Sequence, residues 1–347
     1  MRRAVVIGAT GQIGRPAVGA LARDGWEVTA VSRGGGRDAQ WPEEVRAVRA
    51  DREDDGALAA VVGDGCDVLV DAVAFGPEHA RQVVSLAGRI GSAVVLSSVS
   101  VYEDDEGRGF DTQEEPGGFP EYPVPLTEEQ RTVRPGDAGY STRKAALERE
   151  LLAAGDRLPV TLVRAGAVHG PYCRTPRELY FVKRNLDGRR RRVLAYGGTS
   201  RFHPAGVRNV AEVIRLAAAR PGSRVLNAVD PDAPTVAEIA RAVDAVMGVA
   251  VEDVLVDGPP PAPRVGDTPW SVPAPVVCGM GAAERELGYR PVTRYAESLP
   301  ETVAFIEERL AGGRDWREAY PKMARNYGGL FDYAAEDAWL AGAGRRA

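Results

Sequence analysis

Two side chains that could exchange a proton stand four residues apart, at Tyr140 and Lys144. The surrounding pattern predicts a helix over residues 139–152, and this spacing puts both side chains on one face of it. A free tyrosine has a pKa of about 10, but an adjacent ammonium group favours the phenolate and moves that pKa toward neutrality. The pair is therefore suited to take a proton from an alcohol or to return one to a ketone. Ser98, at the end of a predicted strand, is expected to hydrogen-bond the oxygen of that alcohol or ketone.

Lysine is rare in this chain, which makes Lys144 informative. The 347 residues include 44 Lys and Arg together, and Lys183 and Lys322 are the only other lysines, so a single arginine is weak evidence of function. The net charge of −5 argues against a nucleic-acid partner, which favours a basic face. The three cysteines lie far apart, which predicts neither a disulfide framework nor a metal site. No apolar run reaches the ~18 residues of a membrane helix, so we expect a cytoplasmic protein without a membrane partner.

A glycine-rich turn indicates a dinucleotide cofactor. Residues 8–14 read Gly-Ala-Thr-Gly-Gln-Ile-Gly between the first predicted strand and the first predicted helix. Glycine permits the tight turn and the close approach of a pyrophosphate, which the helix N-terminus attracts. This context favours cofactor binding over a purely structural turn. The cofactor contacts predicted in the N-terminal part of the chain are Gly8, Thr10, Gly11, Gln12, Ile13, Gly14, Arg33, Asp51, Arg52 and Ala74.

The second predicted strand ends without a carboxylate, which bears on the choice of cofactor. An acidic residue there favours NAD, whereas an arginine suits the 2′-phosphate of NADP. The residues present are Ser32 and Arg33. The missing acid favours NADP, with NAD as the alternative. Asp51, after the third predicted strand, either contacts adenine or is a solvated turn residue.

Continuous apolar strands alternate with helical patterns, which predicts an α/β fold, a Rossmann-type doubly wound parallel sheet. The predicted strands are 4–7, 27–31, 45–48, 67–73, 93–97, 160–164 and 224–227, and the predicted helices are 13–23, 57–62, 78–89, 139–152, 210–219 and 294–310. We expect a dinucleotide-binding domain over 1–171, its sheet completed by 205–230. A smaller, discontinuous substrate-binding lobe with a C-terminal tail is expected over 172–204 and 231–347. The irregular segment 103–137 is expected to cover the substrate.

Together these motifs resemble the extended short-chain dehydrogenase/reductase family, the group of NAD-dependent epimerases and dehydratases. The resemblance covers residues 1 to about 310. It rests on the glycine loop, on a strand that ends in Ser97-Ser98 with Tyr102 beyond it, and on Tyr-x-x-x-Lys at 140–144. It is supported by Arg-Ala-Gly-Ala-Val-His-Gly-Pro at 164–171, which is similar to a turn of that family.

The resemblance implies roles for particular residues. It implies a catalytic triad of Ser98, Tyr140 and Lys144, in which Lys144 also binds the nicotinamide ribose. It further implies that Ala167 and Val168 lie near the nicotinamide. The family also implies a homodimer as an expectation.

Several positions depart from the family pattern. Ala165 stands in place of a proline and His169 in place of a tyrosine. Val99 and Ser100 occupy the places of the Asp-Glu pair with which the sugar dehydratases eliminate water, so dehydration, which needs a general acid, is not expected.

Arginine-containing segments at 186–192 and 197–201 look like the region where family members bind a sugar nucleotide, and arginine suits a diphosphate. A solvated basic turn is the alternative. The predicted substrate contacts are Ser100, His169, Arg190, Arg201 and His203.

The sequence thus favours an NADP(H)-dependent oxidoreductase that exchanges hydride at a secondary alcohol or ketone carbon of a polar small molecule, a sugar nucleotide or a natural-product intermediate. A nucleotide-sugar epimerase with retained NAD(P) is the alternative. A non-catalytic cofactor-sensing or RNA-associated protein of the same fold is disfavoured by the Tyr-Lys pair.

Overall fold

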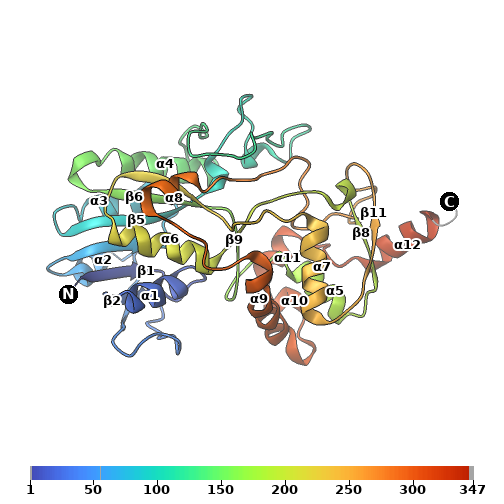
Figure 1. Ribbon diagram of the computed structural model, residues 1–347, viewed down its shortest axis with the longest axis horizontal. Helices are drawn as coiled ribbons and strands as arrows, with labels where there is room; N and C mark the ends of the chain where they lie inside the picture. The colour runs from blue at the N-terminus through green and yellow to red at the C-terminus, as the bar shows by residue number, and fades with distance from the viewer. Residues whose placement is uncertain (1, 55, 344–347) are drawn as a thin grey trace. The chain divides into compact units, whose positions relative to one another are not determined.

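The structure is a computed structural model that describes residues 2–54 and 56–343 (Figure 1). The chain divides into two compact units. The first unit comprises the residues up to 166 together with 207–229 and 278–292. The second unit comprises residues 167–206, 230–277 and the chain from 293 onward.

The first unit is built on a seven-stranded sheet in the order β10-β6-β5-β4-β1-β2-β3, in which every neighbouring pair is parallel. Its strands are β1 (Arg3–Ile7), β2 (Glu27–Ser32), β3 (Arg46–Arg49), β4 (Cys66–Asp71), β5 (Ile90–Ser98), β6 (Val160–Ala165) and β10 (Arg224–Ala228). Because the strand order reverses on either side of β1, the carboxyl ends of β1 and β4 mark the place where ligands bind such sheets. The predicted α/β Rossmann-type sheet is confirmed.

Helices cover both faces of this sheet. They are α1 (Gly14–Arg23), α2 (Ala57–Val62), α3 (Pro77–Val84), α4 (Tyr140–Leu152), α6 (Val207–Ala219) and α8 (Gly281–Leu287). Alternate strand residues such as Val5, Leu69 and Val95 form one buried cluster with side chains of α2, α3 and α4. On the opposite face α1 packs against α6, and both contact the sheet. This arrangement explains the continuous apolar strands, since residues on both faces of each strand are buried.

Two predicted elements end earlier than expected, and local contacts explain both. Strand β4 stops at Asp71 instead of Val73, because the Asp71 carboxylate accepts a hydrogen bond from the backbone N–H of Val73 (3.0 Å) and turns the chain. Helix α3 ends at Val84 instead of Arg89, because the chain turns at Gly88 (φ +88°) to enter β5.

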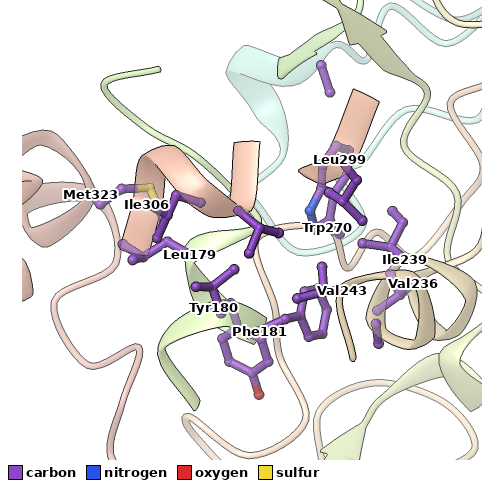
Figure 2. Packing of buried hydrophobic residues seen from close by; sticks show 14 of the residues in the cluster. Leu179, Tyr180, Phe181, Val236, Ile239, Val243, Trp270, Leu299, Ile306 and Met323 are labelled. Carbon is purple, nitrogen blue, oxygen red and sulfur yellow. The ribbon is translucent and has the colours of Figure 1, made fainter. Parts of the chain in front are cut away.

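The second unit has its own hydrophobic core (Figure 2). Its elements are β7 (Ala167–His169), α5 (Leu179–Leu186), β8 (Arg191–Leu194), β9 (Pro204–Gly206), α7 (Val236–Met247), β11 (Glu252–Leu255), α9 (Tyr295–Leu310), α10 (Trp316–Ala319), α11 (Pro321–Asn326) and α12 (Tyr333–Ala343), with short 3-10 turns at η4 (Tyr196–Gly198) and η5 (Ala311–Gly313). The side chains that meet in this core include Phe181 of α5, Val243 of α7 and Leu299 of α9. The loop residue Trp270 packs with them.

Helices α5 and α7 are absent from the sequence-based prediction. Helix α7 carries a recognisable start signal, since Thr235 and Glu238 form a reciprocal capping box. The Thr235 hydroxyl accepts from the Glu238 N–H at 3.2 Å, and the Glu238 carboxylate accepts from the Thr235 N–H at 2.7 Å. The Thr-x-x-Glu pattern before an apolar run could therefore have located α7.

The unit boundaries differ from those expected. The first unit's first segment ends at 166 instead of 171 and its second segment is 207–229 instead of 205–230. Residues 278–292 also belong to the first unit, although they were expected in the substrate lobe. The physical reason is that α8 packs on β10 and α6 of the first unit. Within residues 2–54 and 56–343, no helix is long and apolar enough to cross a membrane.

Candidate active site

The glycine loop at the end of β1 is a close-packed backbone turn. The N–H groups of Gly8 and Ala9 both donate to the carbonyl of Val31 at 3.0 Å, and Gly8 has a φ of +78°. A Cβ at Gly14 would lie 2.2 Å from the carbonyl oxygen of Gly8. The turn is thus compatible with glycine at these positions and with little else, as a loop that brings backbone close to a phosphate requires.

Helix α1 begins directly after this loop and leaves donors for a ligand. Ile13 occupies the N-cap and supplies no side-chain hydrogen bond to the first turn. The side-chain nitrogen of Gln12 is buried and has no hydrogen-bond partner among the described residues. Thr10 and Gly11 complete the loop, and the Thr10 carbonyl accepts from Arg15 Nε at 2.9 Å. The loop therefore presents unsatisfied N–H donors of the kind that bind an anion.

The turn after β2 carries two arginines, Arg33 and Arg37, that differ in their contacts. Arg37 is held by the protein, since its guanidinium donates to the carbonyls of Val45 (2.6 Å) and Trp41 (3.1 Å). Arg33 is exposed, and no such contact is found for its guanidinium among the described residues. The hydroxyl of Ser32 accepts from the N–H of Gly35 at 3.1 Å, which closes the turn. Arg33 is thus the arginine available to a 2′-phosphate.

The residues predicted on the adenine side differ in how their side chains are used. The Asp51 carboxylate accepts a hydrogen bond from the N–H of Glu53 at 3.2 Å. Arg52 is buried, and its guanidinium binds Asp71 at 2.6 Å and the Gln82 side-chain oxygen at 2.9 Å. Because the Arg52 guanidinium is committed to these two partners, a cofactor contact from Arg52 would have to come from its backbone.

Lys144 of α4 is buried under the carboxyl ends of β4 and β5. Its side chain is 3% exposed, and its ammonium donates to the carbonyls of Ala74 at 2.5 Å and of Leu96 at 2.8 Å. An ammonium has three donors, so these contacts leave one N–H of Lys144 for a further partner. Ala74, predicted as a cofactor contact, acts here as an acceptor for Lys144.

The surroundings of Lys144 shift its titration. Burial lowers the pKa of Lys144 to about 8, partly opposed by the negative charges of Asp71 and Glu148 and assisted by the positive charge of Arg52. The Lys144 ammonium is thus close to its titration point at neutral to mildly alkaline pH.

Tyr140 is the first residue of α4, and half of its side chain is exposed. Desolvation raises the pKa of the Tyr140 hydroxyl, and a hydrogen bond with the Ser98 hydroxyl lowers it in part. The structure thus brings the Ser98 and Tyr140 hydroxyls together. The lowering of the pKa expected from Lys144 is not found, because the Lys144 ammonium points to two carbonyls and lies 5.9 Å from the centre of the Tyr140 ring.

A residue that sequence reasoning missed lies beside this pair. The ring of Phe75 is 51% exposed, and its centre is 5.3 Å from the Lys144 ammonium. Its backbone N–H donates to the His79 ring at 2.9 Å, which holds the turn after β4. No motif in the sequence marks Phe75, since its position beside Lys144 arises from the turn after β4.

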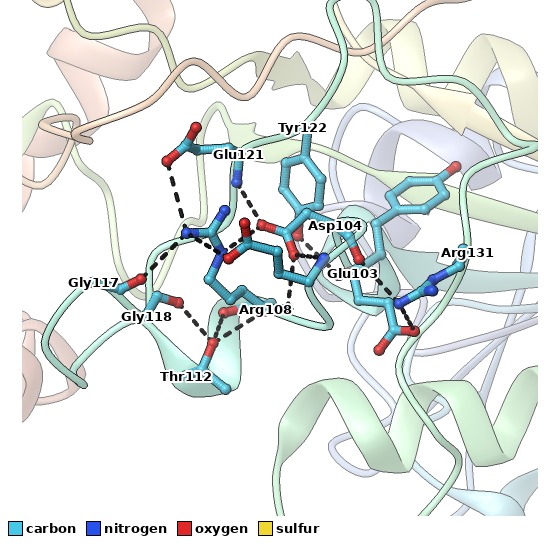
Figure 3. A network of polar contacts seen from close by, with 12 residues as sticks. Glu103, Asp104, Arg108, Thr112, Gly117, Gly118, Glu121, Tyr122 and Arg131 are labelled. Carbon is cyan, nitrogen blue, oxygen red and sulfur yellow. Dashed lines mark hydrogen bonds and ion pairs between the residues drawn. The ribbon is translucent and has the colours of Figure 1, made fainter.

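The segment 103–137 is ordered around one carboxylate, that of Asp104 (Figure 3). Asp104 is 2% exposed and accepts hydrogen bonds from Arg108 Nε (2.7 Å) and from the backbone N–H groups of Arg108 (2.9 Å), Glu106 (3.0 Å) and Glu121 (2.9 Å). Burial raises the pKa of Asp104, but these hydrogen bonds outweigh it and the net shift is downward. The segment is thus a folded loop held together by hydrogen bonds to the Asp104 carboxylate.

This loop is attached to the strand and the helix of the site. The Tyr122 hydroxyl donates to the carbonyl of Tyr102, just beyond β5, at 2.8 Å. The Ser141 hydroxyl, next to Tyr140, donates to the Asp111 carboxylate at 2.9 Å. The hydroxyl of Ser100, predicted to contact substrate, is buried with no partner among the described residues.

The predicted site residues of the second unit are used differently. Ala167 and Val168 lie in β7, which pairs with β9. His169 is 1% exposed, and its Nε2 lies 2.7 Å from an Asp230 carboxylate oxygen. The ring of His203 contacts the Asp230 carbonyl at 2.8 Å. The structure thus brings His169 and His203 together at Asp230 in a buried network.

Most of the arginine run before and within β8 is paired inside the second unit. Arg192 is buried with Asp244 (2.6 Å) and Asp253 (2.6 Å), and Arg191 pairs with Glu252 at 2.9 Å. Arg190 and Arg201 are exposed and form no ion pair among the described residues, although Arg190 donates to the carbonyls of Asn185 (3.4 Å) and Arg189 (3.1 Å).

Comparison with known proteins identifies the family. The model of the NAD dependent epimerase/dehydratase family matches residues 4–228. The chain belongs to this family. Its members are NAD-dependent enzymes of the extended short-chain dehydrogenase/reductase type, as the resemblance implies. A search of curated proteins gives no match.

Solved structures of this family share the fold at low sequence identity. A UDP-galactose 4-epimerase is 23% identical with a TM-score of 0.63, over 89% of this chain and 99% of that chain. A dTDP-glucose 4,6-dehydratase from Bacillus anthracis, in complex with NAD, is 17% identical with a TM-score of 0.66, over 90% and 98%. A UDP-glucuronic acid 4-epimerase from Bacillus cereus, also with NAD, is 14% identical with a TM-score of 0.66, over 90% and 98%.

The chain fits the dinucleotide that its family uses. The unpartnered side-chain nitrogen of Gln12 lies in the loop that a pyrophosphate would approach, and the tight packing of Gly14 against the Gly8 carbonyl keeps that loop compact. The remaining N–H of Lys144 could donate to a ribose hydroxyl. Among residues 2–54 and 56–343, no group of three or more His, Cys, Asp or Glu is arranged to hold a metal ion.

Proposed function

We propose that this protein is an oxidoreductase that exchanges hydride between NADP(H) and a secondary alcohol or ketone carbon of a polar small molecule, a sugar nucleotide or a natural-product intermediate. The observation that carries the proposal is the buried Lys144, held by two carbonyls on the helix that begins with the partly exposed Tyr140. A merely solvated lysine on a helix face would not be 3% exposed at the carboxyl edge of the sheet.

In this proposal Tyr140 moves the proton. Its hydroxyl gives a proton to the oxygen of a ketone substrate, or takes one from an alcohol, in step with hydride exchange at the carbon. Ser98 donates a hydrogen bond to the same substrate oxygen and orients it beside Tyr140. A bound nicotinamide cofactor supplies or accepts the hydride. Lys144 would hold the ribose of that cofactor through the N–H that the Ala74 and Leu96 carbonyls leave unused.

The cofactor contacts are proposed in the first unit at Gly8, Thr10, Gly11, Gln12, Ile13, Gly14, Asp51 and the Arg52 backbone, and at Ala167 and Val168 in the second. Arg33 supports NADP over NAD, because it is exposed and carries no contact that would occupy its guanidinium. The solved structures of the dehydratase and the glucuronic acid epimerase contain NAD, so NAD is the alternative. An Arg33→Ser variant should weaken NADP binding and leave NAD binding within about twofold. Equal loss for both cofactors would contradict a 2′-phosphate contact.

Ser100, Arg190 and Arg201 are proposed to contact the substrate, with the exposed Arg190 and Arg201 at its diphosphate. His169 and His203, predicted as substrate contacts, are buried at Asp230 and are proposed to act on the substrate through that network. We also propose a homodimer in the cytoplasm, and multi-angle light scattering tests the dimer.

The second candidate is a nucleotide-sugar epimerase that retains its cofactor. It is favoured by the epimerases among the solved structures with the same fold. The two functions are separated by incubating the purified protein with nucleoside-diphosphate sugars and added NADPH or NADP. Net change of absorbance at the NADPH band with substrate supports the oxidoreductase. Interconversion of sugars with no net cofactor change supports the epimerase and rejects the first proposal.

A further inference from the structure

A buried ion pair lies behind Lys144 that the proposed function does not use. Asp71 at the carboxyl end of β4 is 0% exposed and pairs with Arg52, from the turn after β3, at 2.6 Å. Arg52 is held in turn by Gln82 of α3, which accepts from its guanidinium at 2.9 Å and donates to its backbone carbonyl at 2.9 Å. The pair thus ties three elements of the first unit together at the edge where the site lies.

The ion pair is connected to Lys144 through a short turn. The second oxygen of Asp71 accepts from the N–H of Val73 at 3.0 Å, and the next residue, Ala74, offers its carbonyl to the Lys144 ammonium at 2.5 Å. The direction of the Ala74 carbonyl depends on the turn that Asp71 closes. When the ammonium donates to the Ala74 carbonyl, one of its three N–H groups is no longer available to other partners.

We propose that the Arg52–Asp71 pair is a positioning device that fixes the turn at 73–74 and thereby sets the place and the charge state of the Lys144 ammonium. Asp71 and Arg52 are positioning residues in this sense, since they act through Lys144. The inference rests on the role proposed for Lys144, but its test below reads the titration of Lys144 directly and needs no substrate.

The charges around Lys144 predict the direction in which each substitution shifts its pKa. Three charged groups act on the ammonium: Asp71 of β4, Arg52 of the β3–α2 turn and Glu148 one turn further along α4. The centres of the Phe75 and Tyr140 rings lie 5.3 Å and 5.9 Å from the ammonium. Burial is the largest effect on the Lys144 pKa and lowers it, Asp71 and Glu148 raise it, and Arg52 lowers it. Glu148 is paired with Arg164 at 2.6 Å, outside the turn at 73–74, whereas Asp71 and Arg52 form the pair that the proposal concerns and are the residues to vary.

The chain offers a direct readout because it has only three lysines. Protein labelled with [13Cε]lysine gives three resonances whose shifts can be followed against pH, and Lys183→Arg and Lys322→Arg variants assign them. Asp71→Asn removes the negative charge and should lower the Lys144 pKa by about 0.5 or more. Arg52→Gln removes the positive charge and should raise it by a similar amount. Asp67→Asn, at the exposed amino end of β4, is the matched control and should leave it unchanged.

The two single variants must move the Lys144 titration in opposite directions. The double variant Asp71→Asn/Arg52→Gln should return it to within about 0.3 of the wild-type value. If Asp71→Asn fails to fold because Arg52 is left without its partner, Arg52→Gln and the double variant carry the test. Unchanged titration in Arg52→Gln, or shifts of the same sign in both single variants, would overturn the proposal. Because the titration is read without substrate, a wild-type protein that turns over no substrate would count against the proposed function and would leave this test intact.

Discussion

At the scale of single residues, Gly14 is the position where the cofactor loop tolerates least. A Cβ added there would lie 2.2 Å from the Gly8 carbonyl oxygen and 2.8 Å from the Ala9 Cα, so backbone must move to admit it. Overpacking of this kind costs ~1–3 kcal/mol, and the moved N–H groups no longer meet a pyrophosphate. Gly14→Ala should therefore lower the melting temperature and weaken binding of NADP or NAD at least about tenfold.

Isothermal titration calorimetry and a thermal melt check this outcome. Gly36→Ala is the control, because no atom lies within 4 Å of a Cβ at Gly36. Normal cofactor affinity in Gly14→Ala would show that the loop at 8–14 does not hold the dinucleotide.

His169 is a second residue with a testable property. Its complete burial lowers its pKa, but the Asp230 carboxylate 2.7 Å away more than compensates, and the net pKa is raised. A group whose pKa is higher in the folded state contributes stability below its unfolded pKa of about 6.5, and this contribution is lost as pH rises through the folded pKa. His169→Gln should therefore destabilise the protein more at pH 6 than at pH 9.

Urea unfolding of wild type and His169→Gln at both pH values measures this difference. The cavity left by the smaller side chain costs the same at each pH, so only the pH-dependent part tests the His169–Asp230 pair. A destabilisation that is equal at both pH values, or larger at pH 9, would refute it.

The candidate site could be predicted from sequence where a motif fixes both residue type and local element. The glycine loop and the Ser98, Tyr140 and Lys144 set stand where the pattern places them. The partners of these residues could not be predicted, because they come from distant parts of the chain. The Ala74 carbonyl on Lys144 is 70 residues away, and Arg52, expected at the cofactor, is held by Asp71.

At the scale of elements, the loop at 103–137 depends on Asp104. The N–H groups of Glu106, Arg108 and Glu121 all donate to its carboxylate, so its ionised form closes two turns at once. Hydrogen bonds to a charged group contribute ~1.5–3 kcal/mol each in mutational series. Asp104→Asn should therefore speed amide hydrogen exchange at these three positions at least about tenfold.

Asp105→Asn is the matched control, since Asp105 is the exposed neighbour. Its amide exchange should equal that of wild type. Protection that survives in Asp104→Asn would mean that the loop is held by its apolar contacts, such as Phe110 with Phe119 and Tyr122.

Helices and strands were predicted most accurately where their apolar residues follow a clear pattern in the sequence. The buried strands β1, β2 and β6 lie within a residue of their predicted bounds, because apolar runs between glycine or polar turns are read directly. Helix α5 was missed because it begins with four consecutive apolar residues, Leu179 to Val182, and so short an apolar run does not distinguish a helix from a buried strand. Its burial comes from packing with α7 and α9, which local sequence does not report.

At the scale of the whole molecule, the chain is two units that each bury their own core. The first holds the whole Ser98, Tyr140 and Lys144 set, while the family match over residues 4–228 also includes 167–206 of the second. The second contains the arginine run and the His169–Asp230 network. The chain crosses between the units several times, which explains why a sequence-based division into domains places the first boundary five residues late and misplaces 278–292.

The central claim of this account is that Tyr140 transfers the proton in a reaction of the bound cofactor. The most direct measurement is the turnover of Tyr140→Phe, together with its affinity for NADP and NAD. The ring and its place at the start of α4 remain, and only the hydroxyl that meets Ser98 is lost. We predict a loss of turnover of about 10²-fold or more, with cofactor affinity within about threefold of wild type. Turnover close to wild type would contradict the claim.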